Sequence, residues 1–145
     1  MRIVRFLSLS SLSLSLSFLS FVYAAIKDCS STSHTGHIQA ISMEPAAPIS
    51  GQSAFIQIDY TLDTPVTDGT ATYSASLNGF PLSPTTQPLC PDLALTTPCP
   101  IAVGAVHYED ILQLDDNTHG TVVARTVWRD QTGVEILCWE FTIRI

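Results

Sequence analysis

Apolar and polar residues alternate along the end of the chain, and this period of two constrains the fold more than any other feature. In residues 134–145 the apolar set is Leu137, Trp139, Phe141, Ile143 and Ile145. Successive side chains of a β-strand point to opposite faces, so the pattern predicts a strand with one buried side. Residues 54–62 alternate in the same way, with Ala54, Ile56, Ile58, Tyr60 and Leu62 on one face.

Weaker strand patterns fill most of the remaining chain. We expect strands in residues 37–42, 69–77, 80–82, 106–114 and 121–128. Asn78–Gly79 predicts a tight hairpin turn, and no segment keeps a helical period for three turns. The sequence therefore predicts an all-β fold, an immunoglobulin-like antiparallel β-sandwich of about seven strands.

The N-terminus has the features of a secretory signal peptide. Arg2 and Arg5 precede an uncharged run rich in Leu, Ser and Phe, and Val22–Tyr23–Ala24 supplies small residues at the cleavage positions. A membrane anchor is the alternative, but serines dilute the apolar run and no stop-transfer charges follow it. We expect residues 1–24 to be a signal peptide and residues 25–145 to form one domain.

Removal of that segment leaves a strongly acidic chain. Four basic residues remain, Lys27, Arg125, Arg129 and Arg144, against thirteen acidic ones, which gives a formal charge of −9. A surface of this charge repels the phosphates of nucleic acid, so nucleic-acid binding is excluded.

All four cysteines lie in the expected mature domain. Export favours disulfides, and four cysteines allow three pairings. The positions favour Cys90–Cys99, which closes a proline-rich loop, and Cys29–Cys138, which ties the start of the domain to its last strand. Zinc binding is disfavoured because there is no Cys-x-x-Cys and no histidine pair at ligand spacing, and we expect no metal.

Residues that could support catalysis do not form a recognisable motif. There is no Gly-x-Ser-x-Gly and no glycine-rich phosphate loop, so we expect neither an enzyme nor a cofactor. Glu109 and Asp110 point to opposite faces of a strand, and we interpret both as solvated surface groups. His107 is interpreted as a surface histidine, with a pH-sensing group at a pocket rim as the alternative.

Several short motifs occur in an order that resembles the ML-domain, or lipid-recognition, family. They are Lys27–Asp28–Cys29–Ser30, Gly51–Gln52–Ser53, Leu77–Asn78–Gly79–Phe80–Pro81, Cys90 to Cys99–Pro100–Ile101, and Leu137–Cys138–Trp139–Glu140. The resemblance covers essentially the whole mature chain. It departs from the family in residues 44–49, which lack a cysteine pair found in the family's sterol carrier, and in a longer loop between Cys90 and Cys99.

The resemblance implies a lipid held between two splayed sheets. It places pocket walls at inward positions of the strands, namely Ile56, Ile58, Tyr60, Tyr73, Leu77, Leu114, Val122, Trp128, Trp139 and Phe141, with Phe80 and Leu82 at the entrance. Ordinary core packing is the alternative for each wall residue, since a cavity takes only part of a sandwich interior.

The function implied by the resemblance is lipid binding and transfer. The expected partners are a sterol or a phospholipid, a membrane in transient contact, and a membrane protein that accepts the lipid. The expected location is extracellular, or the lumen of a lysosome or vacuole. Two alternatives stay open: an accessory factor that presents lipid to a hydrolase, and an immunoglobulin-like interaction module with a filled core.

Overall fold

The computed structural model describes residues 24–145, so the expected signal peptide lies outside the described residues except for Ala24. The described part contains nine strands and one short helix. In chain order they are β1 (Ala25–Asp28), β2 (Gly36–Glu44), β3 (Ser53–Leu62), β4 (Gly69–Leu77), β5 (Phe80–Pro81), β6 (Thr85–Pro88), α1 (Leu89–Asp92), β7 (Gly104–Gln113), β8 (Thr121–Asp130) and β9 (Glu135–Arg144).

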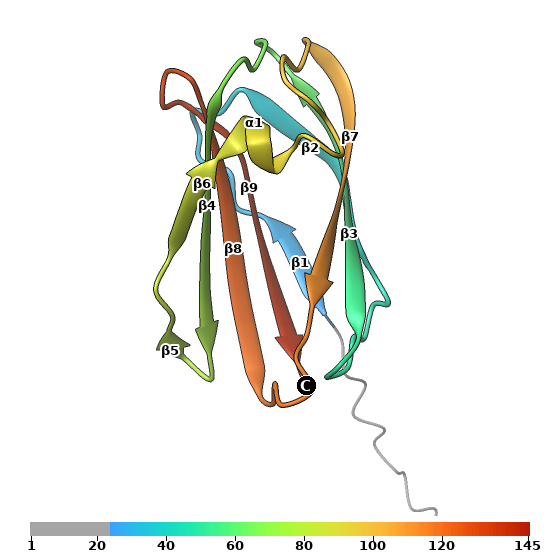
Figure 1. Ribbon diagram of the computed structural model, residues 1–145. Coiled ribbons are helices and arrows are strands. Elements are labelled where there is room, and N and C mark those ends of the chain that lie inside the picture. Colours follow the sequence, from blue (N-terminus) through green and yellow to red (C-terminus); the bar gives the residue numbers. More distant parts are fainter. Residues whose placement is uncertain (1–23) are drawn as a thin grey trace, which may run out of the picture.

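The strands form two antiparallel sheets that face each other (Figure 1). One sheet has the order β1-β9-β8-β4, and β5 and β6 both pair with the free edge of β4. The other sheet has the order β2-β3-β7. Helix α1 lies between the sheets at the end away from the C-terminus (Figure 1), anchored by the buried side chains of Leu89 and Leu93. The predicted antiparallel β-sandwich is confirmed.

The seven predicted strands are all present, and two further strands accompany them. The additional strands are β1, which pairs with β9, and β6, which pairs with β4. Neither has an alternating apolar pattern long enough to be recognised: β1 has four residues and β6 is exposed throughout. Asn78 and Gly79 have φ values of 52° and 82°, as the predicted tight turn between β4 and β5 requires.

Burial in the two clearest strands follows the predicted alternation. In β3, Ala54, Ile56, Ile58, Tyr60 and Leu62 are buried and the residues between them are more exposed. In β9 the register shifts near Ile136, and Glu135 to Trp139 are all buried, so burial alternates only from Trp139 to Arg144. One side of each strand therefore faces the other sheet, and that side forms the core.

Aromatic side chains fill the interior on the side of Trp128. Its indole meets the rings of Tyr108 and Trp139 edge to face, at centroid distances of 4.8 and 5.0 Å, and Tyr60 lies 6.1 Å away. Edge-to-face contacts of this kind add to the energy of burial. Burial raises the pKa of Tyr60 to about 12, so its phenol stays neutral. This part of the sandwich is a filled core.

Two disulfides close the chain, in the pairing favoured by cysteine position. Cys29–Cys138 joins the segment after β1 to β9 across a sequence separation of 109, and Cys90–Cys99 joins α1 to the loop that follows it. Ala24 is buried, and its N–H donates to the carbonyl of Ala46 at 2.8 Å. Within residues 24–145, no helix is long and apolar enough to cross a membrane.

Candidate functional site

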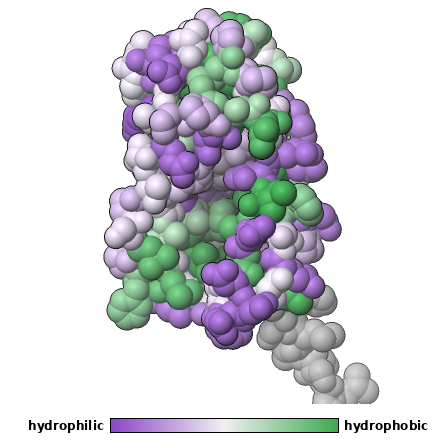
Figure 2. Space-filling view, in the orientation of Figure 1, coloured by the Kyte–Doolittle hydropathy of each residue, from purple (hydrophilic) through white to green (hydrophobic). Residues whose placement is uncertain are grey.

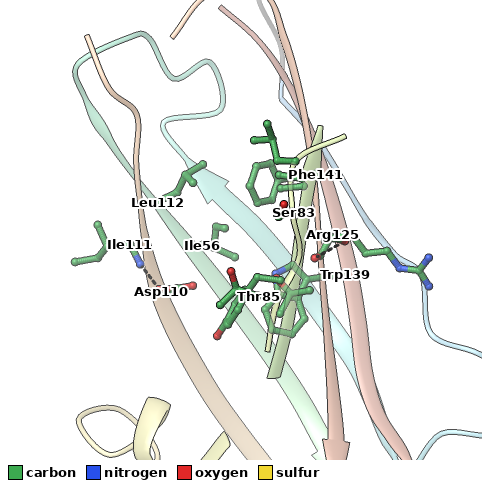
Figure 3. Close-up of a pocket in the computed structure, with 15 residues that line it drawn as sticks. Ile56, Ser83, Thr85, Asp110, Ile111, Leu112, Arg125, Trp139 and Phe141 are labelled. Carbon is green, nitrogen blue, oxygen red and sulfur yellow. Dashed lines mark hydrogen bonds between the residues drawn. The ribbon is translucent and has the colours of Figure 1, made fainter. Parts of the chain in front are cut away.

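A cavity of about 290 Å³ lies between the two sheets. In Figure 3 the side chains of Ile56, Trp139 and Phe141 line its interior, whereas those of Ile111 and Arg125 point away from it. We call this space the cleft. It is lined by Ile56, Tyr73, Ser74, Ala75, Leu82, Ser83, Thr85, Asp110, Ile111, Leu112, Ala124, Arg125, Thr126, Trp139 and Phe141.

Three large apolar side chains form the floor of the cleft. Ile56 comes from β3, and Trp139 and Phe141 come from β9, so the two sheets both contribute. All three side chains are almost completely buried. The alternation that defines these strands in the sequence also turns these residues inward. The floor therefore offers hydrocarbon contacts without a hydrogen-bonding group apart from the indole N–H of Trp139.

The cleft exists because small residues stand where β4 and β8 face the other sheet. Ala75 and Ala124 lie directly opposite each other in the β4–β8 ladder, and both line the cleft. Four residues further along the same two strands, the cross-strand neighbour of Ala71 is Trp128, and its indole fills the interior there. A methyl group cannot reach across the gap between two packed sheets, which is about 10 Å. The two alanines therefore leave the space open.

One ionisable side chain points into this apolar space. Asp110 lies on the inward face of β7, and Figure 3 shows its carboxyl directed into the cleft. One carboxyl oxygen accepts the N–H of Ile111 at 2.8 Å. Burial raises the pKa of Asp110 above its usual value, and the charge of Asp92 adds to the rise. The expectation that Asp110 is a solvated surface group is wrong.

Two tyrosines neighbour this carboxyl. Tyr73, from β4, lines the cleft and donates its hydroxyl to Asp92 of α1. Burial and that hydrogen bond raise the pKa of Tyr73. Burial also raises the pKa of Tyr108, and the charge of Asp110 contributes. Both phenols therefore stay neutral at physiological pH.

The other acidic groups of β7 and β3 lie on the outer face of the sheet. His107 contacts Asp59 at 2.6 Å and Glu109 at 3.2 Å, and Gln57 donates to Glu109 at 3.0 Å. The hydrogen bonds to Asp59 and Glu109 raise the pKa of His107. His107 is half exposed and does not line the cleft, in keeping with the surface interpretation.

The structure separates the residues predicted as pocket walls and entrance into three groups. Those that line the cleft are Ile56, Tyr73, Leu82, Trp139 and Phe141. Those that pack in the filled core instead are Ile58, Tyr60 and Trp128. Those that lie outside the lining are Leu77 and Val122, which pair with each other, Leu114, which is buried after β7, and Phe80, which is 75% exposed.

The prediction missed several residues that shape the cleft, above all Asp110, Leu112, Ala75 and Ala124. Parity within the strands could have placed them: Asp110 and Leu112 share the face of Tyr108, and Ala75 shares the face of Tyr73. The predicted pocket walls were all large residues, so the prediction did not include the two alanines that leave the space open.

Metal ligands are not gathered in the described part of the chain. Residues 24–145 contain no group of three His, Cys, Asp or Glu side chains placed to hold a metal ion. Asp115 and Asp116, the second acidic pair of the sequence, are exposed in the turn between β7 and β8. The arrangement of the cleft is one for holding an apolar molecule with a small polar group.

Comparison with known proteins identifies relatives of this chain. The family model of the ML domain matches residues 24–145. The "Putative phosphatidylglycerol/phosphatidylinositol transfer protein 1" of Dictyostelium discoideum is 28% identical over 120 residues, which cover 81% of this chain and 78% of the relative.

Two solved structures share the fold at low sequence identity. A Niemann-Pick type C2 protein from the Japanese carpenter ant has a TM-score of 0.61 and 18% identity, covering 81% of this chain and 96% of the other. Chicken MD-1, solved in complex with lipid IVa, has a TM-score of 0.62 and 16% identity, covering 83% of this chain and 88% of the other.

Proposed function

The chain belongs to the ML-domain family, and from this premise we propose that it binds a lipid in the cleft and transfers it between membranes. The observation that carries the proposal is the unfilled apolar space between the sheets beside Ala75 and Ala124. The relative named as a phosphatidylglycerol/phosphatidylinositol transfer protein supports transfer, and the MD-1 structure holds a lipid on the same fold.

Binding in the cleft needs no catalytic group. Burial of hydrocarbon gains about 0.8 kcal/mol for each CH₂ removed from water. A volume of about 290 Å³ lies just below the usual range for ligand pockets, roughly 300–1,000 Å³. The cleft as it stands has room for part of a lipid. A whole sterol or phospholipid requires the cleft to widen.

The segment between β5 and β6 supplies a place where widening is possible. A second hollow of about 400 Å³ lies beyond this segment and is lined by Ser76, Pro81, Leu82 and Pro84 among others. Leu82 lines both hollows. The N–H of Leu82 donates to the carbonyl of Ala75 on β4 at 2.8 Å, so an outward shift that enlarges the cleft involves Ser83 and Pro84, which lie between the paired residues of β5 and β6.

Exposed apolar side chains flank the cleft on both sides and support contact with a membrane. Phe80 and Leu82 are 75% and 55% exposed on one side. Ile111 and its cross-strand neighbour Phe55 are 55% and 50% exposed on the other. Figure 2 shows apolar surface at the lower left, over β5, beside the hollowed middle of the molecule. Apolar residues on both sides of an opening allow a lipid to pass without crossing water.

The proposed location is outside the cell or in the lumen of a lysosome or vacuole. Two disulfides in the described residues fit an oxidising compartment and fit the expected signal peptide. A membrane protein that accepts the lipid is a further proposed partner. Transfer between vesicles with no other protein present distinguishes an autonomous carrier from an accessory factor that presents lipid to a hydrolase.

A phenylalanine in place of Ala124 tests the cleft directly. The ring should occupy the space opposite Ile56 and lower the amount of bound lipid about tenfold or more, because the lost volume removes contacts with several CH₂ groups. Native mass spectrometry and lipid extraction of the purified protein measure the bound lipid, and vesicle assays measure transfer.

The matched control is Ala105→Phe. Ala105 is exposed on β7 and does not line the cleft, so this variant should retain lipid. If Ala124→Phe does not fold, Ala75→Leu fills the cleft from the paired strand. Lipid binding by the folded cleft variants equal to that of the wild type contradicts the proposed site.

A further inference from the structure

The cleft combines apolar walls with one inward carboxyl group. Asp110 lies on the same face of β7 as Tyr108 and Leu112, and its carboxyl lines the cleft. A group needed only for solubility would stand on the outer face, where Glu109 and His107 stand. The position of Asp110 costs desolvation energy unless a partner compensates it.

The protein itself provides Asp110 with little compensation. The carboxyl accepts a hydrogen bond from the N–H of Ile111, and the hydroxyl of Tyr108 also acts on it as a hydrogen-bond donor that lowers its pKa. The described part of the chain gives it no salt bridge. Arg125 lines the cleft but directs its guanidinium to the outer face, where its Nε–H donates to the sulfur of Cys138 at 3.2 Å (Figure 3). Acceptor capacity on the Asp110 carboxylate therefore remains open toward the cleft.

The other titratable groups that neighbour Asp110 do not offset its charge. They are Tyr108 on the same strand, Tyr73 on β4 and Asp92 on α1, and none of them is a cation. The remaining cleft residues of β6 and β9 are neutral, and include Thr85, Trp139 and Phe141. An anion placed beside the half-buried Asp110 would meet a negative charge that water screens less than it would on the open surface.

We propose that Asp110 selects lipids whose polar end donates a hydrogen bond, either a hydroxyl or a protonated amine, over lipids that bring a carboxylate or a phosphate to this part of the cleft. This inference rests on the proposed function, since it requires a lipid in the cleft. The apolar walls hold the hydrocarbon, and the carboxylate holds the donating end.

Three single-chain probes of equal length test the selection: hexadecan-1-ol, hexadecylamine and hexadecanoate. Their dissociation constants are measured at neutral pH from the fluorescence of the tryptophans, since Trp139 lines the cleft. The wild type should bind the alcohol and the amine about tenfold more tightly than the carboxylate. The first two donate a hydrogen bond to the carboxylate of Asp110, whereas the charge of the third is repelled by it. Comparison of the dissociation constants of hexadecan-1-ol and hexadecylamine then shows whether the site prefers a neutral or a cationic hydrogen-bond donor.

Asp110→Asn removes the charge and keeps the size of the side chain. This variant should bind hexadecanoate about tenfold more tightly than the wild type and hexadecylamine about tenfold less tightly. Glu109→Gln is the matched control, because it removes the same charge from the next residue on the outer face and should leave the order of the probes unchanged.

The outcomes separate the inference from the proposed function. Binding of none of the three probes contradicts the lipid-carrying function. Equal binding of all three by the wild type, or equal effects of Asp110→Asn and Glu109→Gln, overturns the role of Asp110 while lipid binding stands. As the pH falls below neutral, binding of hexadecylamine should weaken in the wild type, because burial raises the pKa of Asp110 and protonation removes its charge. The same change of pH should leave hexadecylamine binding by Asp110→Asn unaltered.

Discussion

At the scale of single residues, Asp130 shows how one buried carboxylate holds a turn. It accepts hydrogen bonds from the N–H and hydroxyl of Thr132 at 2.8 and 2.7 Å and from the N–H of Val134 at 3.1 Å. Burial alone would raise the pKa of Asp130, but the hydrogen bonds from Thr132, Val134 and Gly133 together lower it. The ionised form therefore stabilises the β8–β9 hairpin.

Replacement of Asp130 by alanine should lower the free energy of unfolding by about 1–3 kcal/mol at neutral pH, because three donors lose their acceptor. The folded-state pKa is depressed, so this contribution is present above the unfolded value of about 3.9 and disappears as the pH falls through the folded value. Urea unfolding at neutral and acidic pH measures it. Asp115→Ala, in an exposed turn, is the control; an equal loss of stability in both variants contradicts the role of Asp130.

The sequence predicts the face of a side chain better than its environment. Ile56 and Ile58 are both inward and buried, yet Ile56 lines the cleft and Ile58 packs in the filled core. The alternation of side chains along a strand determines the direction of each side chain. The extent of the open space depends instead on which residues of the other sheet lie opposite. The Ala75–Ala124 pair decides this, and it becomes visible only once the β4–β8 register is known.

At the scale of elements, long alternating strands were predictable and short or polar ones were not. β3 and β9 alternate over many residues and match their predicted positions. β6 and α1 occupy a polar, proline-rich stretch in which local sequence gives no period, and tertiary contacts determine their structure. The same reasoning applies to β1, whose four residues acquire strand geometry by pairing with β9.

The attachment of β1 to β9 should depend on the Cys29–Cys138 disulfide. In the chain-entropy model, a bridge across a loop of this length contributes about 4–5 kcal/mol, and its removal typically costs about 2–5 kcal/mol. A Cys29→Ala/Cys138→Ala variant should unfold at a correspondingly lower urea concentration. Removal of the Cys90–Cys99 bridge, with a sequence separation of 9, should cost less by the same model. A larger loss from the shorter loop would contradict this order.

At the scale of the whole molecule, the charge of −9 on residues 25–145 opposes contact with an anionic membrane. Histidine side chains take up protons between about pH 7 and 5, and the pKa of His107 is already raised by its hydrogen bonds to Asp59 and Glu109. Weaker repulsion lets Phe80 and Leu82 approach the lipid surface.

Transfer to anionic vesicles should therefore be faster at about pH 5 than at neutral pH, and added salt should reduce the difference, because the Debye length is about 8 Å at physiological ionic strength. Stopped-flow transfer of a fluorescent lipid measures the rates. Neutral vesicles are the control and should show a smaller change. Equal rates at both pH values in low salt would remove the electrostatic explanation and leave lipid carriage itself untouched.

The pairing of β1 with β9 also sets the order of events during synthesis. Cys29 emerges long before Cys138, since at roughly 5–20 residues per second the intervening 109 positions take on the order of 5–20 s to produce. During that interval Cys29 has no native partner, while Cys90 and Cys99 emerge and can capture it. Correct oxidation therefore favours slow or reversible thiol chemistry until the last strand of the domain arrives. Only then does β1 cover the edge of β9, which would otherwise offer unpaired backbone groups to another chain.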